Sequence, residues 1–143
     1  MPAPVTSKAS TTWRGDLFTG DGTTSLDSSG AGTFPVEWNA RAEGSDSTTT
    51  PEELLAAAHA TCFSMAFSNE LKKNGTPPTE LRTTAEVTFV AGTGITGIAL
   101  TVDARVEDVD GEAFQKIAEG AKENCPVSQA LKAVEITLEA TLS

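Results

Sequence analysis

Apolar and polar residues alternate along three stretches of the chain, and each of these stretches predicts a β-strand. Residues 96–107 have the clearest alternation, with one face formed by Ile98, Leu100, Val102, Ala104 and Val106. Residues 83–91 precede this stretch and are separated from it by a glycine-containing gap at residues 92–94, which is typical of a hairpin. Residues 134–142 alternate again and predict the last strand.

A long helix is predicted over residues 50–73. Thr50 suits the N-cap, Pro51 suits the first helical position, and Glu53 completes a capping box with Thr50. Asn74 and Gly75 follow the last helical residues and favour a helix end. Apolar residues cover nearly the whole circumference, so we expect this helix to be buried in the middle of the structure. Its many alanines would allow a second helix to approach closely.

A second helix is predicted over residues 112–124, with Asp110 as its N-cap. Its apolar stripe consists of Phe114, Ile117, Ala118 and Ala121. Cys125 and Pro126 should end this helix, because the residue before a proline avoids the helical region. Pro126 can in turn open a short helical turn at residues 127–131.

Residues 9–43 are rich in Gly, Ser, Thr and Asp, and short strand-like pieces at 9–13, 23–26 and 36–42 lie between turn signals. This composition indicates a β-ribbon with little core of its own. The element order predicts an α+β fold in which an antiparallel sheet packs around the long central helix. We expect a single domain over residues 1–143, composed of the ribbon at 1–49 and a helix–sheet core at 50–143.

Composition excludes several classes of partner. The 143 residues include 20 acidic and 10 basic ones, for a formal net charge of −10, which disfavours nucleic acid and anionic membrane surfaces. One histidine and two cysteines are too few for a structural zinc site, and no cofactor is expected. No apolar stretch resembles a secretory signal or a membrane span, so we expect a cytoplasmic protein. In that compartment two cysteines are more often thiols or a transient redox pair than a structural disulfide.

Five residues could carry chemistry, and each also has an ordinary structural interpretation. Cys62 lies near the middle of the long helix and could simply be a small buried apolar residue. Cys125 lies at a helix break, where the following helical N-terminus would stabilise its thiolate. His59, one turn before Cys62, could act as its base or be a packing and hydrogen-bonding residue. Glu52 is explained as a first-turn acid, and Arg41 as a surface strand residue.

Two longer motifs contain these cysteines and resemble the OsmC/Ohr family, in its OsmC branch. Residues 50–66 read TPEELLAAAHATCFSMA, and residues 124–132 read NCPVSQALK. Residues 39–44, NARAEG, and residues 13–16, WRGD, match as well, so the resemblance covers essentially the whole chain. It implies an OsmC-like domain that forms an intertwined homodimer with active sites at the interface.

The resemblance also implies a function in oxidative or osmotic stress defence. Members of the family are thiol peroxidases that reduce organic hydroperoxides, and hydrogen peroxide less well, with an external dithiol, lipoyl-type in some cases, as reductant. By this likeness Cys62 is the peroxidatic cysteine, Cys125 the resolving cysteine and Glu52 the catalytic glutamate. Arg41 is the best match to the active-site arginine, with Arg14 as the alternative. We expect an apolar substrate pocket lined by residues such as Phe63, Met65 and Phe67.

Helix geometry bears on the predicted dimer, because ten helical residues rise ~15 Å and separate Glu52 from Cys62 along one helix. If both act at one site, the second helix must come from another chain, with the two helices crossing antiparallel near Ala57. Two other functions remain open from the residues alone. Cys62 and His59 could form a cysteine hydrolase pair, or the cysteines could belong to a non-enzymatic stress-sensing protein.

Overall fold

The computed structural model describes residues 2–143, which divide into two compact units. The first unit ends at Pro51 and the second begins at Glu52. Among the residues described, no helix is long and apolar enough to cross a bilayer.

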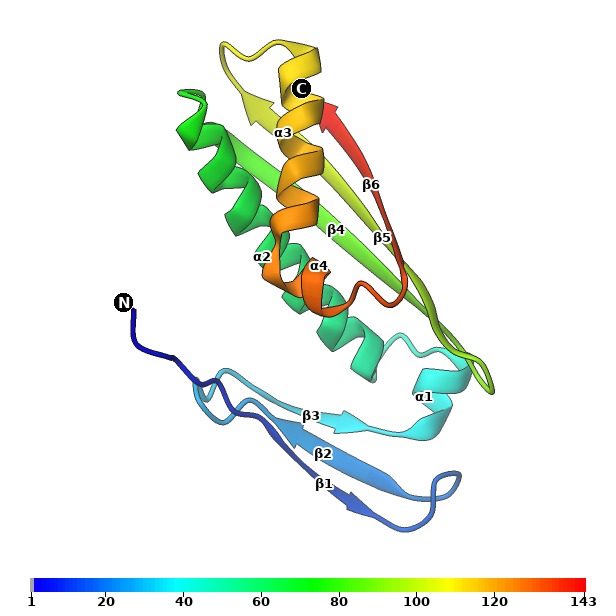
Figure 1. The fold of residues 1–143 in the computed structure, drawn as a ribbon. Coiled ribbons are helices and arrows are strands. Elements are labelled where there is room, and N and C mark those ends of the chain that lie inside the picture. The colour runs from blue at the N-terminus through cyan, green and yellow to red at the C-terminus, as the bar shows by residue number, and fades with distance from the viewer. Residues whose placement is uncertain (1) are drawn as a thin grey trace. The chain divides into compact units, whose positions relative to one another are not determined.

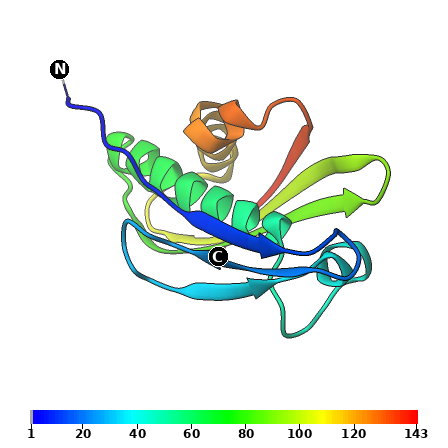
Figure 2. The same cartoon turned by 90° about the horizontal axis from the view of Figure 1, so that it is seen from below.

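The first unit is a three-stranded antiparallel sheet in the order β1-β2-β3, as Figure 2 shows. Its strands are β1 (Ser10–Arg14), β2 (Asp21–Ser25) and β3 (Thr33–Val36). Ser10 pairs with Ser25 across the first hairpin, and Ser25 pairs with Thr33 across the second. Within residues 2–51 the buried residue is Ala40, so the prediction of a ribbon with little core is confirmed.

The prediction of a strand at residues 36–42 is wrong. The strand β3 ends at Val36, and the short helix α1 (Trp38–Glu43) follows. The backbone N–H of Gly44 donates to the Ala40 carbonyl oxygen at 3.0 Å, and Gly44 has a φ of 90°. Glycine adopts this left-handed conformation at little cost, so it ends the helix readily. Arg41 is therefore a helical residue rather than a strand residue.

The second unit begins with the long helix α2 (Pro51–Lys73), whose predicted bounds are confirmed. The strands β4 (Pro78–Val90) and β5 (Gly94–Val106) then form the predicted antiparallel hairpin. The turn between them contains Gly92 with a φ of 83°. Every second residue of β5 from Ile98 to Val106 is buried, as the period-two pattern predicts.

The helices α3 (Gly111–Asn124) and α4 (Pro126–Ala130) connect β5 to the last strand, β6 (Glu135–Leu142). Asp110 is the N-cap of α3 as predicted, and its Oδ1 accepts a hydrogen bond from the Ala113 N–H at 2.8 Å. The sheet has the order β4-β5-β6, and β6 runs parallel to β5. The prediction of an antiparallel sheet is therefore wrong for this pair. A helical connection returns the chain along the sheet, so that the next strand runs in the same direction as β5.

One face of this sheet carries the core of the second unit, with α2 and α3 packed against it (Figure 1). Phe67 is the centre of an aromatic row, with ring centroids 5.5 Å from Phe63 and 5.4 Å from Phe114. The stripe of α2 that faces this core consists of His59, Phe63, Phe67 and Leu71, all of them fully buried. Burial of α2 all round, expected from its composition, is not found within the single chain, since Met65 is 69% exposed.

Candidate active site

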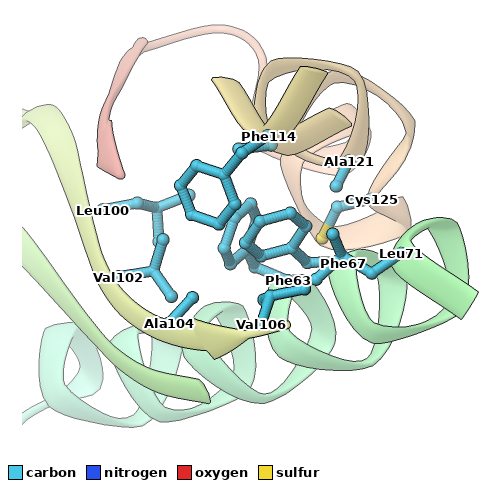
Figure 3. Packing of buried hydrophobic residues seen from close by; sticks show 11 residues of the cluster. Phe63, Phe67, Leu71, Leu100, Val102, Ala104, Val106, Phe114, Ala121 and Cys125 are labelled. Carbon is cyan, nitrogen blue, oxygen red and sulfur yellow. The ribbon is translucent and has the colours of Figure 1, made fainter. Parts of the chain in front are cut away.

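The junction between α3 and α4 places Cys125 in the core. Its backbone N–H donates to the Ala121 carbonyl oxygen at 2.9 Å and closes α3, while its carbonyl oxygen accepts from Gln129 N–H at 3.0 Å and opens α4. Its φ of −61° and ψ of 122° are extended, as expected before Pro126. Figure 3 shows the Cys125 side chain among the core residues, with its sulfur toward α2.

The two cysteines, 63 positions apart in the chain, meet at this point. The Cys125 Sγ donates a hydrogen bond to the Cys62 Sγ at 3.1 Å, and both residues are free thiols. Their accessibility differs: Cys62 is half-buried, whereas Cys125 is 0% exposed. Cys62 is therefore the more accessible of the two residues, whereas a reagent can reach Cys125 only if the surrounding core moves.

Burial raises the pKa of the Cys62 thiol, and the neighbouring Cys125 thiol raises it further. The backbone N–H of Val127, in the first turn of α4, acts in the opposite direction and lowers this pKa. The sequence predicted that the N-terminus of this helix would act on Cys125, but the Cys125 side chain makes no capping hydrogen bond. The helix N–H acts on the other sulfur, because the extended backbone of Cys125 directs its own side chain toward α2.

His59 connects α2 to the same segment through a second contact. Its Nε2 lies 2.7 Å from the Ser128 Oγ, and both residues are buried. Among residues 2–143 its Nδ1 has no hydrogen-bond partner. Burial also lowers the pKa of His59, so the ring is neutral near pH 7. Neither ring nitrogen is bonded to Cys62, and this geometry disfavours the hydrolase pair.

Ser128 had no role in the sequence predictions, although it belongs to the second cysteine motif. The available signal was its position three residues after Cys125, on the first turn of a helix opened by Pro126. His59 likewise lies three residues before Cys62 on α2. Polar residues at this spacing share one face of a helix. The sequence could not indicate that the two faces would meet.

The other predicted site residues lie in different places. Glu52 is in the first turn of α2 and is 6% exposed, and the helical rise of ~15 Å separates it from Cys62 along that helix. Arg41 is half-buried in the last turn of α1, and Arg14 is exposed at the end of β1; both belong to the first unit. The roles of Arg41 and Glu52 remain predictions.

The expected substrate pocket is wrong in two of its three residues. Phe63 and Phe67 are fully buried in the core and cannot line an open pocket. Met65 borders a surface groove of about 570 Å³ between α2 and the start of β4, together with polar residues such as Ser68 and Thr79. In the described part of the chain, no group of three or more His, Cys, Asp and Glu residues is arranged to hold a metal ion.

The protein has an α+β fold in which a half-buried thiol and a fully buried thiol are in contact. The two thiols together form a candidate dithiol centre. The sequence profile of the OsmC-like protein family matches residues 44–139. The chain therefore belongs to the OsmC-like family, as the two cysteine motifs predicted.

Comparison with individual proteins agrees with this assignment. Over 138 residues the chain is 45% identical to peroxiredoxin OsmC of Escherichia coli K12, covering 94% of this chain and 95% of that protein. It is 31% identical over 103 residues to the organic hydroperoxide resistance protein OhrB of Bacillus subtilis 168, covering 71% and 75%. The crystal structure of an OsmC-like protein from Mycoplasma pneumoniae superimposes with a TM-score of 0.73 at 13% identity, covering 98% and 99%, and supports the fold.

Proposed function

We propose that this protein is a thiol peroxidase that reduces organic hydroperoxides, and hydrogen peroxide less efficiently, to alcohols and water. The observation that carries the proposal is the 3.1 Å contact between Cys62 and Cys125. Membership of the OsmC-like family and the names of its relatives, a peroxiredoxin and an organic hydroperoxide resistance protein, support the same activity.

The exposures of the two thiols support their assignment. Cys62 is the half-buried thiol that a hydroperoxide can reach, and its thiolate attacks the terminal peroxide oxygen. The O–O bond breaks, the sulfur becomes a sulfenic acid, and the alkoxide leaves as the alcohol after taking up a proton. Cys125, inaccessible to solvent but in contact with Cys62, then attacks the sulfenic sulfur. A Cys62–Cys125 disulfide forms and water is released.

A dithiol from outside the protein completes the cycle. It reduces the Cys62–Cys125 disulfide by two thiol–disulfide exchanges and leaves as its own disulfide. A small lipoyl-type dithiol, the reductant implied by the resemblance, suits a site in which only one sulfur is accessible. Its thiolate would attack the half-buried Cys62 sulfur, with the Cys125 thiolate as leaving group.

Cys62 needs a positive partner to react quickly near pH 7, because burial raises the pKa of its thiol. Arg41 is the residue that we propose for this role, with Glu52 orienting the guanidinium through a bidentate pair. The rise of ~15 Å between Glu52 and Cys62 along α2 argues that the glutamate of one chain serves the cysteine of another. We therefore propose a homodimer with composite active sites. A sedimentation mass of one chain with full activity would contradict it. We propose a cytoplasmic location, as expected from the sequence.

The proposed activity is tested by cumene hydroperoxide consumption with dihydrolipoamide as reductant. We expect turnover in the wild-type protein and loss of at least about a thousandfold in Cys62→Ser. With no thiol added, Cys125→Ser should consume a single equivalent and stop at the Cys62 sulfenic acid, whereas the wild-type protein stops at the disulfide. Hydrogen peroxide should react more slowly. Turnover retained in Cys62→Ser would refute the mechanism. A disulfide formed once, without catalytic turnover, would instead indicate a stress-sensing protein.

A further inference from the structure

The core-facing stripe of α2 contains one residue that packing alone does not explain. Its other members are Phe63, Phe67 and Leu71, at the helical spacing of four, and His59 continues the same spacing. The His59 side chain is 0% exposed, and its Nδ1 has no partner among the described residues. A buried polar atom without a partner is destabilising, and an apolar side chain would avoid this cost. The presence of histidine therefore points to the bond made by its other nitrogen.

That bond runs in parallel with the contact between the sulfurs. His59 and Cys62 are three residues apart on α2, and Ser128 and Cys125 are three residues apart on the facing segment. His59 pairs with Ser128 at 2.7 Å, and Cys62 pairs with Cys125 at 3.1 Å. The two contacts connect α2 to residues 125–128, and these two segments run antiparallel to each other. The hydrogen bond between His59 and Ser128 involves no sulfur, but it connects α2 to the segment that contains Cys125.

A contact of this kind matters for the position of the segment, because α4 has only five residues. An isolated helix of that length is unstable, and its position depends on tertiary contacts. We infer that the His59–Ser128 hydrogen bond holds Cys125 within reach of the oxidised Cys62, so that both are positioning residues for the resolving step. This inference rests on the proposed peroxidase function. It assigns no role to either residue in the first attack on the hydroperoxide.

The test separates the two chemical steps in pre-reduced protein. Cumene hydroperoxide is added at one equivalent, and quenched samples are analysed by mass spectrometry for Cys62 sulfenic acid, trapped with dimedone, and for the disulfide. In Ser128→Ala we expect sulfenic acid to form within about twofold of the wild-type rate and the disulfide to form at least about tenfold more slowly, since small misplacements of reacting groups are costly. The dimedone adduct should rise accordingly.

Matched variants distinguish positioning from general loosening. Ser64→Ala removes a hydrogen bond of the same 2.7 Å length from the same helix, to Thr83 on β4, and should change neither rate. His59→Gln places an amide group near the Nε2 position that can donate to or accept from the Ser128 hydroxyl, and it should restore part of the disulfide rate that His59→Leu loses. Wild-type resolution in Ser128→Ala, equal slowing of both steps, or equal effects of Ser64→Ala and Ser128→Ala would overturn the inference. If Ser128→Ala does not fold, the comparison of His59→Leu, which removes the hydrogen bond, with Ser128→Thr, which keeps the hydroxyl, decides in the same way.

A second arm tests positioning without any hydroperoxide. The Cys62–Cys125 disulfide is equilibrated with glutathione redox buffers, and the effective concentration of the two thiols is measured. We expect it to fall at least about tenfold in Ser128→Ala and to stay unchanged in Ser64→Ala. If the wild-type protein does not consume hydroperoxide, the proposed peroxidase function is refuted, but this measurement still tests the positioning role of the His59–Ser128 hydrogen bond. An unchanged effective concentration in Ser128→Ala would refute that positioning role, whatever the peroxidase assay shows.

Discussion

The two halves of the buried stripe on α2 use different kinds of contact. Phe63, Phe67 and Leu71 contribute apolar surface to the core between α2, α3 and β5. His59 instead contacts the α4 segment through a hydrogen bond, and Cys62 on the adjoining face does so through its sulfur. The first set of contacts contributes stability through buried apolar surface. The second set supplies a defined position and leaves an unpaired nitrogen and a desolvated thiol, which together are a cost to stability.

The largest expected effect on stability is in the apolar half. Phe67→Ala removes a fully buried ring that contacts Phe63 and Phe114, and it should lower the free energy of unfolding by about 3–5 kcal/mol. Chemical denaturation measures this loss. Lys73→Ala on the same helix, which breaks an exposed ion pair with Glu70, should cost at most about 0.5 kcal/mol. Similar losses in the two variants would show that this half of α2 does not dominate stability.

An effect on reactivity is expected from Arg41. If Arg41 serves Cys62 as proposed, it favours the thiolate, and Arg41→Ala should slow Cys62 alkylation and oxidation near pH 7 by at least about tenfold. The reaction should then speed up as the pH rises past the ordinary range of a thiol, because burial alone raises this pKa. Iodoacetamide rates measured against pH test this. Arg14→Ala is the matched control, and a loss there instead would assign the role to Arg14.

The smallest effect concerns the pH dependence of stability. Burial lowers the pKa of His59 below its usual 6.5 in the folded protein, so the unfolded chain takes up its proton first as the pH falls. The free energy of unfolding should therefore decrease from about pH 6.5 downward, by at most about 1.4 kcal/mol per pH unit from this residue.

Denaturation of the wild-type protein and of His59→Gln between about pH 7.5 and pH 5 measures this contribution. The variant has no imidazole to protonate, so its stability should fall less steeply over that interval. Parallel curves for the two proteins would mean that His59 does not titrate differently in the folded and unfolded chains.

Much of the second unit could be predicted from local signals. The bounds of α2, the N-cap at Asp110, the buried face of β5 and the break at Cys125–Pro126 follow from periodicity, capping and proline chemistry within a few residues. The short helix α1 was missed, because a six-residue helix is hardly longer than a strand and carries too few periods to be recognised.

The sequence by itself determined the family, through its two cysteine motifs, and the local structure around each cysteine. Only the tertiary structure decided that β6 runs parallel to β5, that Phe63 and Phe67 fill the core instead of lining a pocket, and that the helix α4 acts on Cys62. It alone also paired His59 with Ser128, 69 positions away. The physical reason is that local pattern fixes which face of an element is apolar. Which polar residues of two distant faces meet depends on how the whole unit packs.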